Sequence, residues 1–317
     1  TKKNTAKKLV SIKKSPKNLG NPMKGRDIIV KALENEGVKV IFGYPGGTSM
    51  EIHQGLTLTK KIRMVLPRHE QGGSFAAGGY ARSTGEVGVC MATSGPGATN
   101  LITGIIDAKM DSIPIVAITG QVASTLLGSD AFQETDIMGA TFPLVKHSYM
   151  IQNVEEIPRI IHEAFHIARS GRPGPVLIDI PKNIQQQEGI ADFDVSFDCP
   201  SYKPNLKPSV LQCKKAAHTI QTAKRPIIYA GGGIISSGAS EELRAFAKKT
   251  GIPVTTTAMG LGAFPSNDPL SLRMLGMHGA VYANIAINHA DLIIAMGVRF
   301  DDRVTGKLAE FCKDAKF

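Results

Sequence analysis

Short apolar runs alternate with helical patterns along the chain from Gly25 onward. The predicted strands are rich in β-branched residues and mostly end in Gly or Pro: VKVIFGYPGG, RMVLP, GEVGVCMATSG, SIPIVAITGQ and GPVLIDIP. Between them, helical spacing of apolar residues occurs in GRDIIVKALENEG and in residues 71–83, 98–109 and 154–169. This alternation predicts an α/β fold, in which helices cover both faces of a parallel sheet.

A second strand–helix series follows an interruption. Residues 184–210 break the rhythm with three prolines and no sustained periodicity, and we place an inter-domain linker at residues 188–206. RPIIYAGGG then predicts a strand that enters a glycine turn, and ADLIIAMGVRF predicts another strand. SEELRAFAKKTG predicts a helix with Ser240 as its N-cap. The sequence stops where a further strand would be expected, which suggests an incomplete second domain over residues 207–317.

Charge and composition narrow the class of protein. The 317-residue chain has a net charge of +10, but residues 1–25 hold eight lysines and no acid, which leaves about +2 for the rest. Such a block predicts a disordered tail over residues 1–24, or the remnant of a targeting segment, and gives no basis for nucleic-acid binding. We expect no membrane span, because charged residues interrupt every apolar run. The four cysteines form no CxxC pair, so no structural zinc site is expected.

Glu70 is the first candidate for chemistry, in the stretch LPRHEQGG. It follows an apolar strand and precedes a Gly/Ala-rich helix start, where small residues let another group approach the backbone closely. Open α/β sheets bind ligands beyond the carboxyl ends of their strands. A solvated loop cluster of Arg68, His69 and Glu70 fits the spacing at least as well, so spacing alone does not decide.

Glycine-rich turns follow three other predicted strands. SGPGATN (94–100) leads into a helix, and such a turn offers free N–H groups to an anion or a closely packed cofactor. GGG (231–233) matches neither the GxGxxG nor the Walker pattern. In GVRFDDRVTG (297–306), Arg299 and Arg303 offer bidentate forks for phosphate or carboxylate. Plain strand–helix connections and a structural ion-pair cluster also fit these turns.

Taken together, these segments resemble the large catalytic subunit of acetohydroxyacid (acetolactate) synthase, a thiamine-diphosphate enzyme. The resemblance covers residues 25–317 and rests on these motifs, in order: LPRHEQGG, GYARSTGEVGVCMATSGPGATN, VAITGQ, DAFQETD, SGRPGPVLIDIPK, MLGMHG and GVRFDDRVTGK. Many thiamine-diphosphate enzymes share the early motifs, whereas DAFQE, GMHG and GVRFDDRVTG are more specific. The chain departs from the family pattern at Ala123, where proline is usual, and at Gly78, where an acid is common.

The resemblance implies a family architecture of three α/β domains. Residues 25–187 would be the pyrimidine-binding domain, and residues 207–317 an incomplete, Rossmann-like FAD-binding central domain. The third, diphosphate-binding domain is expected to be missing, so the chain would be an N-terminal fragment that is inactive alone. The implied cofactors are thiamine diphosphate, FAD and Mg²⁺. The Mg²⁺ ligands would belong to the third domain, so no metal ligand is assigned here.

The resemblance also implies roles for single residues. Glu70 would hydrogen-bond the pyrimidine ring of thiamine diphosphate near Gly46, and Gln133 would act at the reacting carbon beside Phe132, which makes Glu70 and Gln133 the catalytic pair. The residues that would contact FAD are Arg172, Gly231, Gly232, Gly233, Gly276, Met277, His278, Gly279, Asn284, Gly297, Val298 and Arg299.

The implied reaction decarboxylates pyruvate and ligates the two-carbon unit to a second 2-oxo acid, pyruvate or 2-oxobutyrate. It is the first common step of valine, leucine and isoleucine biosynthesis. Lys146 would face the substrate channel, and Arg303 would receive the carboxylate of the second oxo acid. The implied partners are further copies in a homodimer or tetramer, and a small regulatory subunit.

Two alternatives remain open at this point. Another FAD-binding thiamine-diphosphate enzyme, such as a pyruvate oxidase or a glyoxylate carboligase, would share the early motifs, although DAFQETD and GVRFDDRVTG argue against both. A fragment without the third domain would instead be a binding module without catalysis. The family is cytoplasmic in bacteria and plastid-located in plants and algae, and EQGGxFAA is closer to the plant version.

Overall fold

The structure, a computed structural model, describes residues 21–195 and 202–317, and the chain divides into two compact units, residues 1–204 and 205–317. The expected tail falls outside the described residues as far as residue 20. Strand β1 (Met23–Lys24) pairs antiparallel with β8 (Glu188–Gly189). Strand β1 lies where the tail was expected to end, and β8 lies where the linker was expected to begin. Their pairing joins residues 23–24 to residues 188–189 within the first unit.

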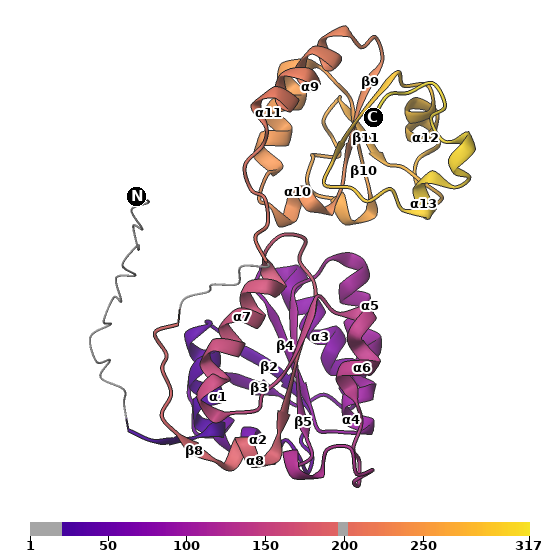
Figure 1. The fold of residues 1–317 in the computed structure, drawn as a ribbon. Coiled ribbons are helices and arrows are strands. Elements are labelled where there is room, and N and C mark those ends of the chain that lie inside the picture. Colours follow the sequence, from indigo (N-terminus) through magenta and orange to yellow (C-terminus); the bar gives the residue numbers. More distant parts are fainter. Residues whose placement is uncertain (1–20, 196–201) are drawn as a thin grey trace, which may run out of the picture. The chain divides into compact units, whose positions relative to one another are not determined.

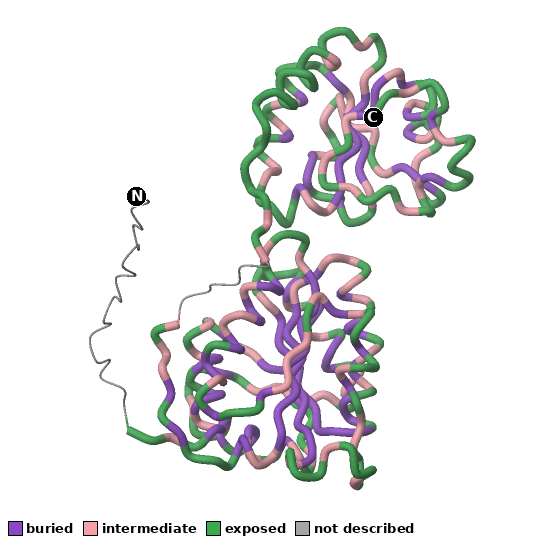
Figure 2. Tube along the Cα trace, in the orientation of Figure 1, coloured by how far each residue is buried: buried purple, intermediate pink, exposed green. Residues whose placement is uncertain are grey.

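The first unit is built on a parallel sheet with the strand order β3-β2-β4-β5-β7-β6. The strands are β2 (Val40–Gly43), β3 (Arg63–Val65), β4 (Gly88–Ala92), β5 (Ile115–Gln121), β6 (His147–Met150) and β7 (Val176–Pro181). Every residue of β4, β5 and β7 is buried, as Figure 2 shows for the centre of the unit. Burial on both faces explains why these strands read as continuous apolar runs in the sequence.

Helices cover both faces of this sheet (Figure 1). One face carries α1 (Gly25–Asn35), α2 (Met50–Leu56), α7 (Ile157–Arg169) and α8 (Lys182–Gln186). The other carries α3 (Glu70–Thr84), α4 (Pro96–Asn100), α5 (Ile102–Asp111) and α6 (Ile137–Thr141). Each face has its own core: Leu33 and Phe165 lie in the first, Leu101 and Ile105 in the second. Short 3₁₀ turns occupy Ser124–Leu126, Phe142–Leu144 and Val154–Glu156.

The strand order has a switch point between β2 and β4, where the chain connections diverge. From β2 the chain continues into α2 on one face, and from the neighbouring β4 it continues into α4 and α5 on the opposite face. Where two adjacent connections leave a parallel sheet in opposite directions, the carboxyl ends of the strands open a ligand-sized gap. Gly46 and Gly95 lie in the two loops that border this gap.

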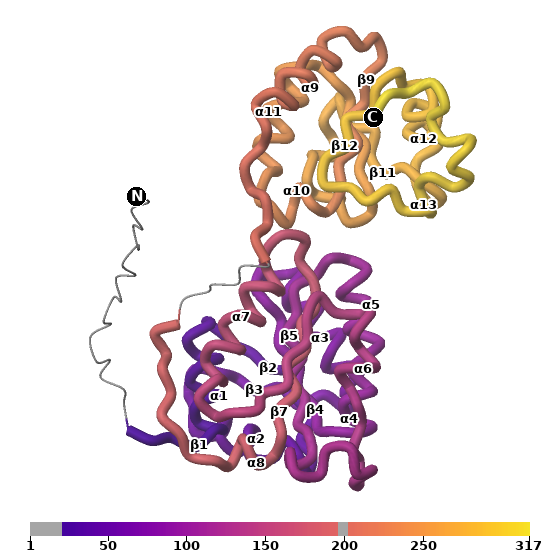
Figure 3. The backbone as a smooth tube through the Cα atoms, viewed as in Figure 1, coloured from indigo at the N-terminus to yellow at the C-terminus, as the bar shows by residue number. Residues whose placement is uncertain are grey.

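The second unit has a parallel sheet in the order β11-β10-β9-β12. Its strands are β9 (Pro226–Ala230), β10 (Val254–Thr256), β11 (Ser271–Met274) and β12 (Leu292–Met296). Helices α9 (Val210–Thr222), α10 (Gly232–Ser236) and α11 (Ser240–Thr250) cover one face, and α12 (Val281–Asn288) covers the other (Figure 3). Helix α13 (Asp302–Thr305) follows β12, and 3₁₀ turns lie at Ala258–Gly260 and Leu308–Glu310.

These two sheets confirm the predicted α/β class with successive parallel sheets. One cap prediction is wrong. Ala239, not Ser240, is the N-cap of α11, because the carbonyl of Ala239 already accepts the backbone hydrogen bond of Leu243 and Ser240 is helical. Among the described residues, no helix is both long and apolar enough to span a bilayer.

Candidate functional site

Glu70 is the first residue of α3 and lies at the carboxyl edge of the sheet, directly after the four-residue loop that leaves β3. His69 is the N-cap of this helix, and its Nδ1 accepts a hydrogen bond from the backbone N–H of Gln71 at 3.1 Å. The half-buried Glu70 carboxylate instead turns to α4, where Asn100 Nδ2 donates to its Oε2 at 3.0 Å. Glu70 is thus held by a neighbouring helix and is not part of a solvated cluster with Arg68 and His69.

Two glycines near Glu70 pack against the side chain of Thr93. A Cβ atom on Gly97 would lie 3.4 Å from Glu70 Oε1 and 2.8 Å from Thr93 Cγ2. A Cβ atom on Gly46 would lie 2.5 Å from two side-chain carbons of Thr93, which is closer than real contacts allow. The backbones of both loops therefore approach each other around Thr93, and only glycine fits at positions 46 and 97.

Hydroxyl groups tie the two loops together. Thr48 and Thr93 share a hydrogen bond between their Oγ1 atoms at 2.9 Å, and the backbone N–H of Ser94 donates to Thr48 Oγ1 at 2.9 Å. The buried Oγ of Ser94 has no hydrogen-bond partner within the described ranges. Ser94 belongs to the turn SGPGATN, which the sequence had indicated, whereas Thr48 and Thr93 were not predicted, although each is a polar residue near the end of an apolar strand.

The DAFQE segment reaches the same edge. Gln133 has a φ of +58°, and a Cβ atom on Gly95 (φ +61°) would lie 2.8 Å from the carbonyl oxygen of Gln133. Phe132 beside it is 88% exposed, so its ring is available for contact. The structure therefore brings together Glu70, Gly46, Gln133 and Phe132, which the sequence had placed in one site.

Lys146 lies apart from this group within the first unit, and its expected place in a substrate channel stays a prediction. It precedes β6 at the amino edge of the sheet, and its ammonium donates to the carbonyls of Ile167 and Ser170 and to the hydroxyl of Tyr202. Burial lowers the pKa of Lys146. A lysine does lie at the carboxyl edge: Lys182 is the first residue of α8, directly after β7.

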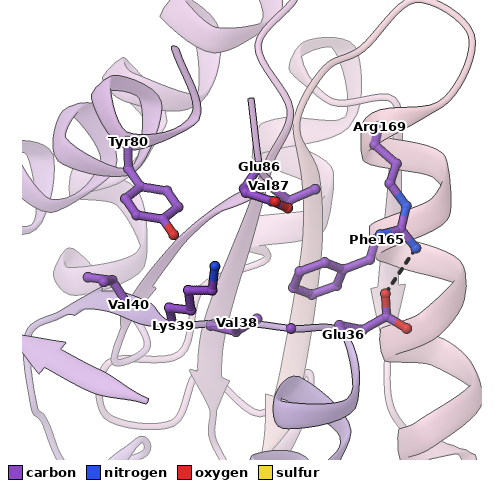
Figure 4. A pocket seen from close by; sticks show the side chains of 10 residues that line it. Glu36, Val38, Lys39, Val40, Tyr80, Glu86, Val87, Phe165 and Arg169 are labelled. Atoms are coloured by element: carbon purple, nitrogen blue, oxygen red, sulfur yellow. Dashed lines mark hydrogen bonds and ion pairs between the residues drawn. The ribbon is translucent and has the colours of Figure 1, made fainter. Parts of the chain in front are cut away.

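Arg172 also lies at the amino edge, in the loop before β7, where its Nε donates to Ser112 Oγ at 2.8 Å. Its expected contact with FAD stays a prediction. A small pocket opens at the same edge near the start of β2, as Figure 4 shows. Its volume is only about 10 Å³, and the ion pair of Glu36 with Arg169 (3.1 Å) borders it. It has no room for a cofactor.

In the second unit, the loops after β9 and β12 touch through glycines. A Cβ atom on Gly231 would lie 2.3 Å from the carbonyl oxygen of Gly297, and one on Gly233 would lie 2.6 Å from Gly297 Cα. Gly232 is packed similarly, with a Cβ position 3.0 Å from Met259 Cβ. Val298 follows, and its Cγ1 would lie 2.9 Å from a Cβ on Gly231. The predicted FAD residues of these two loops are therefore neighbours.

The loop of Gly276, Met277, His278 and Gly279 follows β11 and is fixed by Asn284 of α12. Asn284 accepts from the N–H of Gly276 at 2.7 Å and donates to its carbonyl at 2.9 Å. The N–H of Met277 donates to the carbonyl of Arg303 at 2.7 Å, which joins this loop to α13. An open cavity of about 450 Å³ lies between them.

The charged groups of GVRFDDRVTG are paired within the loop. Arg299 contacts Asp301 at 2.8 Å, and Arg303 contacts Asp302 at 3.2 Å, with the Arg303 side chain 65% exposed. A hydrogen bond from the backbone N–H of Arg303 lowers the pKa of Asp301. The structural ion-pair cluster that the sequence allowed is therefore present in this loop. The exposed Arg303 guanidinium still has N–H donors that can bind an anion.

Two family models match the chain, one in each unit. Residues 23–140 match the model described as thiamine pyrophosphate enzyme, N-terminal TPP binding domain. Residues 213–317 match the model described as thiamine pyrophosphate enzyme, central domain. The first match contains Glu70 and its surroundings, and the second contains the glycine loops after β9, β11 and β12.

Curated plant proteins are similar over almost the whole chain. It is 58% identical to acetolactate synthase 3, chloroplastic, of Brassica napus over 297 residues, which cover 93% of this chain and 45% of that protein. It is 59% identical to acetolactate synthase 2, chloroplastic, of Nicotiana tabacum, and 57% identical to acetolactate synthase, chloroplastic, of Arabidopsis thaliana, in each case over 93% of this chain and 44% of the relative. The chain thus spans less than half the length of these relatives.

Proposed function

We propose that this chain, which belongs to the thiamine pyrophosphate enzyme family and carries its N-terminal and central domains, forms part of an acetolactate synthase. The proposed substrates are pyruvate and a second 2-oxo acid, either pyruvate or 2-oxobutyrate. The observation that carries the proposal is the Glu70 carboxylate, which Asn100 fixes close to Gly97 at the carboxyl edge of the sheet. Identities of 57–59% across both units support this reaction over that of other family members.

The residues around Glu70 fit thiamine diphosphate. Gly46 and Gly97 present bare backbone beside Thr93 and Glu70, and the buried Ser94 hydroxyl has no partner among the described residues. The bound cofactor would supply the electron sink for decarboxylation. Glu70 would hydrogen-bond the pyrimidine ring through Oε1, since Asn100 occupies Oε2. Orientation of this ring is the task we assign to the first unit.

Substrate contacts would come from the DAFQE segment and from the second unit. Gln133 and Phe132 are both exposed at the edge that carries Glu70, and they would contact the reacting oxo acid. The exposed Arg303 guanidinium would receive the carboxylate of the second oxo acid, because its planar fork suits bidentate carboxylate binding. Lys146 is likewise proposed to face the substrate channel.

FAD would bind to the loops after β9, β11 and β12, with Arg172 as a further contact. This unit fits a polar ligand, because the hydroxyls of Tyr229 and Thr256 are buried and lack a partner in the described part of the chain. Burial raises the pKa of Tyr229 to about 12, which keeps it a neutral donor. No residue here is proposed as a Mg²⁺ ligand.

We further propose a plastid location, self-association and a small regulatory subunit as a partner, on the similarity to the chloroplastic relatives.

The test is acetolactate formation from pyruvate by the complete product of the gene, with Glu70→Gln as the variant and Glu86→Gln as the control at an exposed acid. Loss of the Glu70 carboxylate should lower the rate by about 10²–10⁴-fold, the usual contribution of a proton-transferring side chain. Near-normal activity of Glu70→Gln would refute the assignment. Identification of the product would distinguish an acetolactate synthase from a carboligase that acts on glyoxylate. Oxidation of pyruvate coupled to flavin reduction would instead indicate a pyruvate oxidase.

A further inference from the structure

A carboxylate lies buried in the middle of the first sheet, where the chemistry described so far has no use for it. Asp179 on β7 has no exposed surface, and its neighbours along the strand are Val, Leu, Ile and Pro. A carboxylate in such a place is costly to bury unless hydrogen bonds satisfy it. Thr119 Oγ1 donates to Asp179 Oδ1 at 2.7 Å, and Gln121 Nε2 donates to Oδ2 at 2.9 Å. An apolar residue at this position would stabilise the sheet more than a buried carboxylate does.

Gln121 connects this carboxylate to a surface loop. It is the last residue of β5 and only 2% exposed. Its Nε2 donates both to Asp179 and to the carbonyl of Thr135 (3.0 Å), while its Oε1 accepts from the N–H of Val122 (2.8 Å). A carboxylate accepts and never donates, so Asp179 determines which end of the Gln121 amide faces it. That orientation directs an N–H to the carbonyl of Thr135.

The loop before Thr135 is held in a strained form. Asp130 and Gln133 are non-glycine residues with φ values of +55° and +58°, a left-handed conformation that side-chain-bearing residues rarely adopt. The Glu134 carboxylate accepts from the N–H groups of Gly128 and Ala131, which lowers the pKa of Glu134 and fixes the loop from within. Strain of this kind persists only where the surroundings impose the conformation.

We propose that Asp179 and Gln121 are positioning residues that hold the loop of residues 128–135 in the form that places Gln133 against Gly95. The chain of contacts runs from Asp179 through Gln121 to the carbonyl of Thr135, two residues after Gln133. Its significance for turnover rests on the proposed function, because only there does Gln133 contact the substrate. The buried carboxylate would thus serve a loop at the substrate edge and not the sheet in which it lies.

The direct test is hydrogen exchange of this chain, followed by mass spectrometry of the segment 128–136. Asp179→Asn replaces one of the two acceptor oxygens by an N–H and removes the charge, which weakens the hydrogen bond that holds the Gln121 amide in place for Thr135. The matched control is Thr119→Val, which removes the other donor to the same carboxylate without touching the loop. We expect exchange in 128–136 to rise at least about tenfold in Asp179→Asn, the effect of losing a hydrogen bond to a charged group, and to stay unchanged in Thr119→Val.

Equal exchange of the loop in the two variants, or faster exchange confined to β5 and β7, would overturn the proposal. This measurement involves neither cofactor nor turnover, so its outcome is independent of the proposed function. A second readout uses the absence of Trp from the sequence. In a Phe132→Trp background, the anisotropy of the single indole should fall with Asp179→Asn and not with Thr119→Val. Identical anisotropy in both would also contradict the proposal.

The complete gene product gives the functional readout. If the pair positions Gln133, Asp179→Asn and Gln121→Met should lower kcat for acetolactate formation by about 10-fold or more, as expected for a misplaced reacting group. The affinity for thiamine diphosphate should stay at the wild-type value, since Glu70 and Asn100 are not touched. If Asp179→Asn and Gln121→Met lowered the affinity for thiamine diphosphate equally, the sheet would be generally damaged. That result would refute the proposal that these residues position Gln133.

Discussion

Asn100 donates a hydrogen bond of 3.0 Å from Nδ2 to Oε2 of Glu70, which joins the last residue of α4 to the first residue of α3. The two residues lie 30 positions apart, and the fold brings them to the same edge of the sheet. The bond occupies Glu70 Oε2 and leaves Oε1 close to Gly97, which has no side chain of its own. One oxygen of the carboxylate is thus fixed by the protein and the other is available to a ligand.

Removal of the Asn100 amide is predicted to weaken cofactor binding. Asn100→Leu keeps a similar size but leaves Glu70 Oε2 without its donor, and the affinity of the complete gene product for thiamine diphosphate should fall about tenfold. Asn100→Asp should lower it further, because two carboxylates then face each other. Calorimetric titration measures both, with Thr103→Ala on the exposed surface of α5 as the control. Wild-type affinity in the Leu variant would contradict the prediction.

Loss of the Asn284 side chain should destabilise the second unit. Its two bonds to Gly276 satisfy a buried N–H and a buried carbonyl, and Asn284→Ala leaves both without a partner. The expected loss in free energy of unfolding is about 2–3 kcal/mol, measured by urea denaturation. Asn267→Ala, at an exposed position, is the control and should change little. Equal unfolding midpoints for the two variants would show that the Gly276 loop does not need this anchor.

The charge state of Asp179 predicts a specific pH dependence. Burial raises the pKa of Asp179 to about 6 from its ordinary value of 3.8, and the charge of Asp136 acts in the same direction. A raised pKa in the folded state means that this contribution to stability is complete below about pH 4 and is lost as the pH rises through about 6. The free energy of unfolding of the wild type, minus that of Asp179→Asn, should therefore fall by about 1 kcal/mol from pH 5 to 7.5.

Urea unfolding of both proteins at the two pH values gives this double difference. Groups other than Asp179 titrate alike in the two proteins and cancel. A difference that is independent of pH, or that grows with pH, would mean that the Asp179 carboxyl does not carry the shift.

The sequence predicted the buried parts of the fold best. β4, β5 and β7 are apolar throughout because both faces of the sheet are covered, and their runs are unmistakable. The edge strands β6 (HSYM) and β11 (SLRM) were not predicted, because a strand with one open side needs no continuous apolar run. The pairing of β1 with β8 could not be predicted from the sequence, because two-residue strands carry no periodic pattern of apolar residues.

The sequence predicted which residues belong to the candidate site, but not the contacts that hold them in place. Glu70, Gly46 and Gln133 each follow a strand that ends at the same edge, so parallel order alone brings them together. For Lys146 the sequence did not reveal the end of β6 beside which it lies, and its place in a substrate channel stays a prediction. Asp179 gave a usable signal, a lone acid within VLIDIP, whose partner could be found only from the register of β5 against β7.

The pairing of β1 with β8 has a consequence for how the first unit forms. Met23 stands opposite Gly189, and the N–H of Gly25 donates to the carbonyl of Gln187 at 2.8 Å, so the beginning and the end of the unit meet. Contacts between residues so far apart in sequence form late and slow the folding of a domain. During synthesis, this unit can close only after residue 189 has left the ribosome. The adjacent ends also make it a candidate for circular permutation, with new termini cut into an exposed loop.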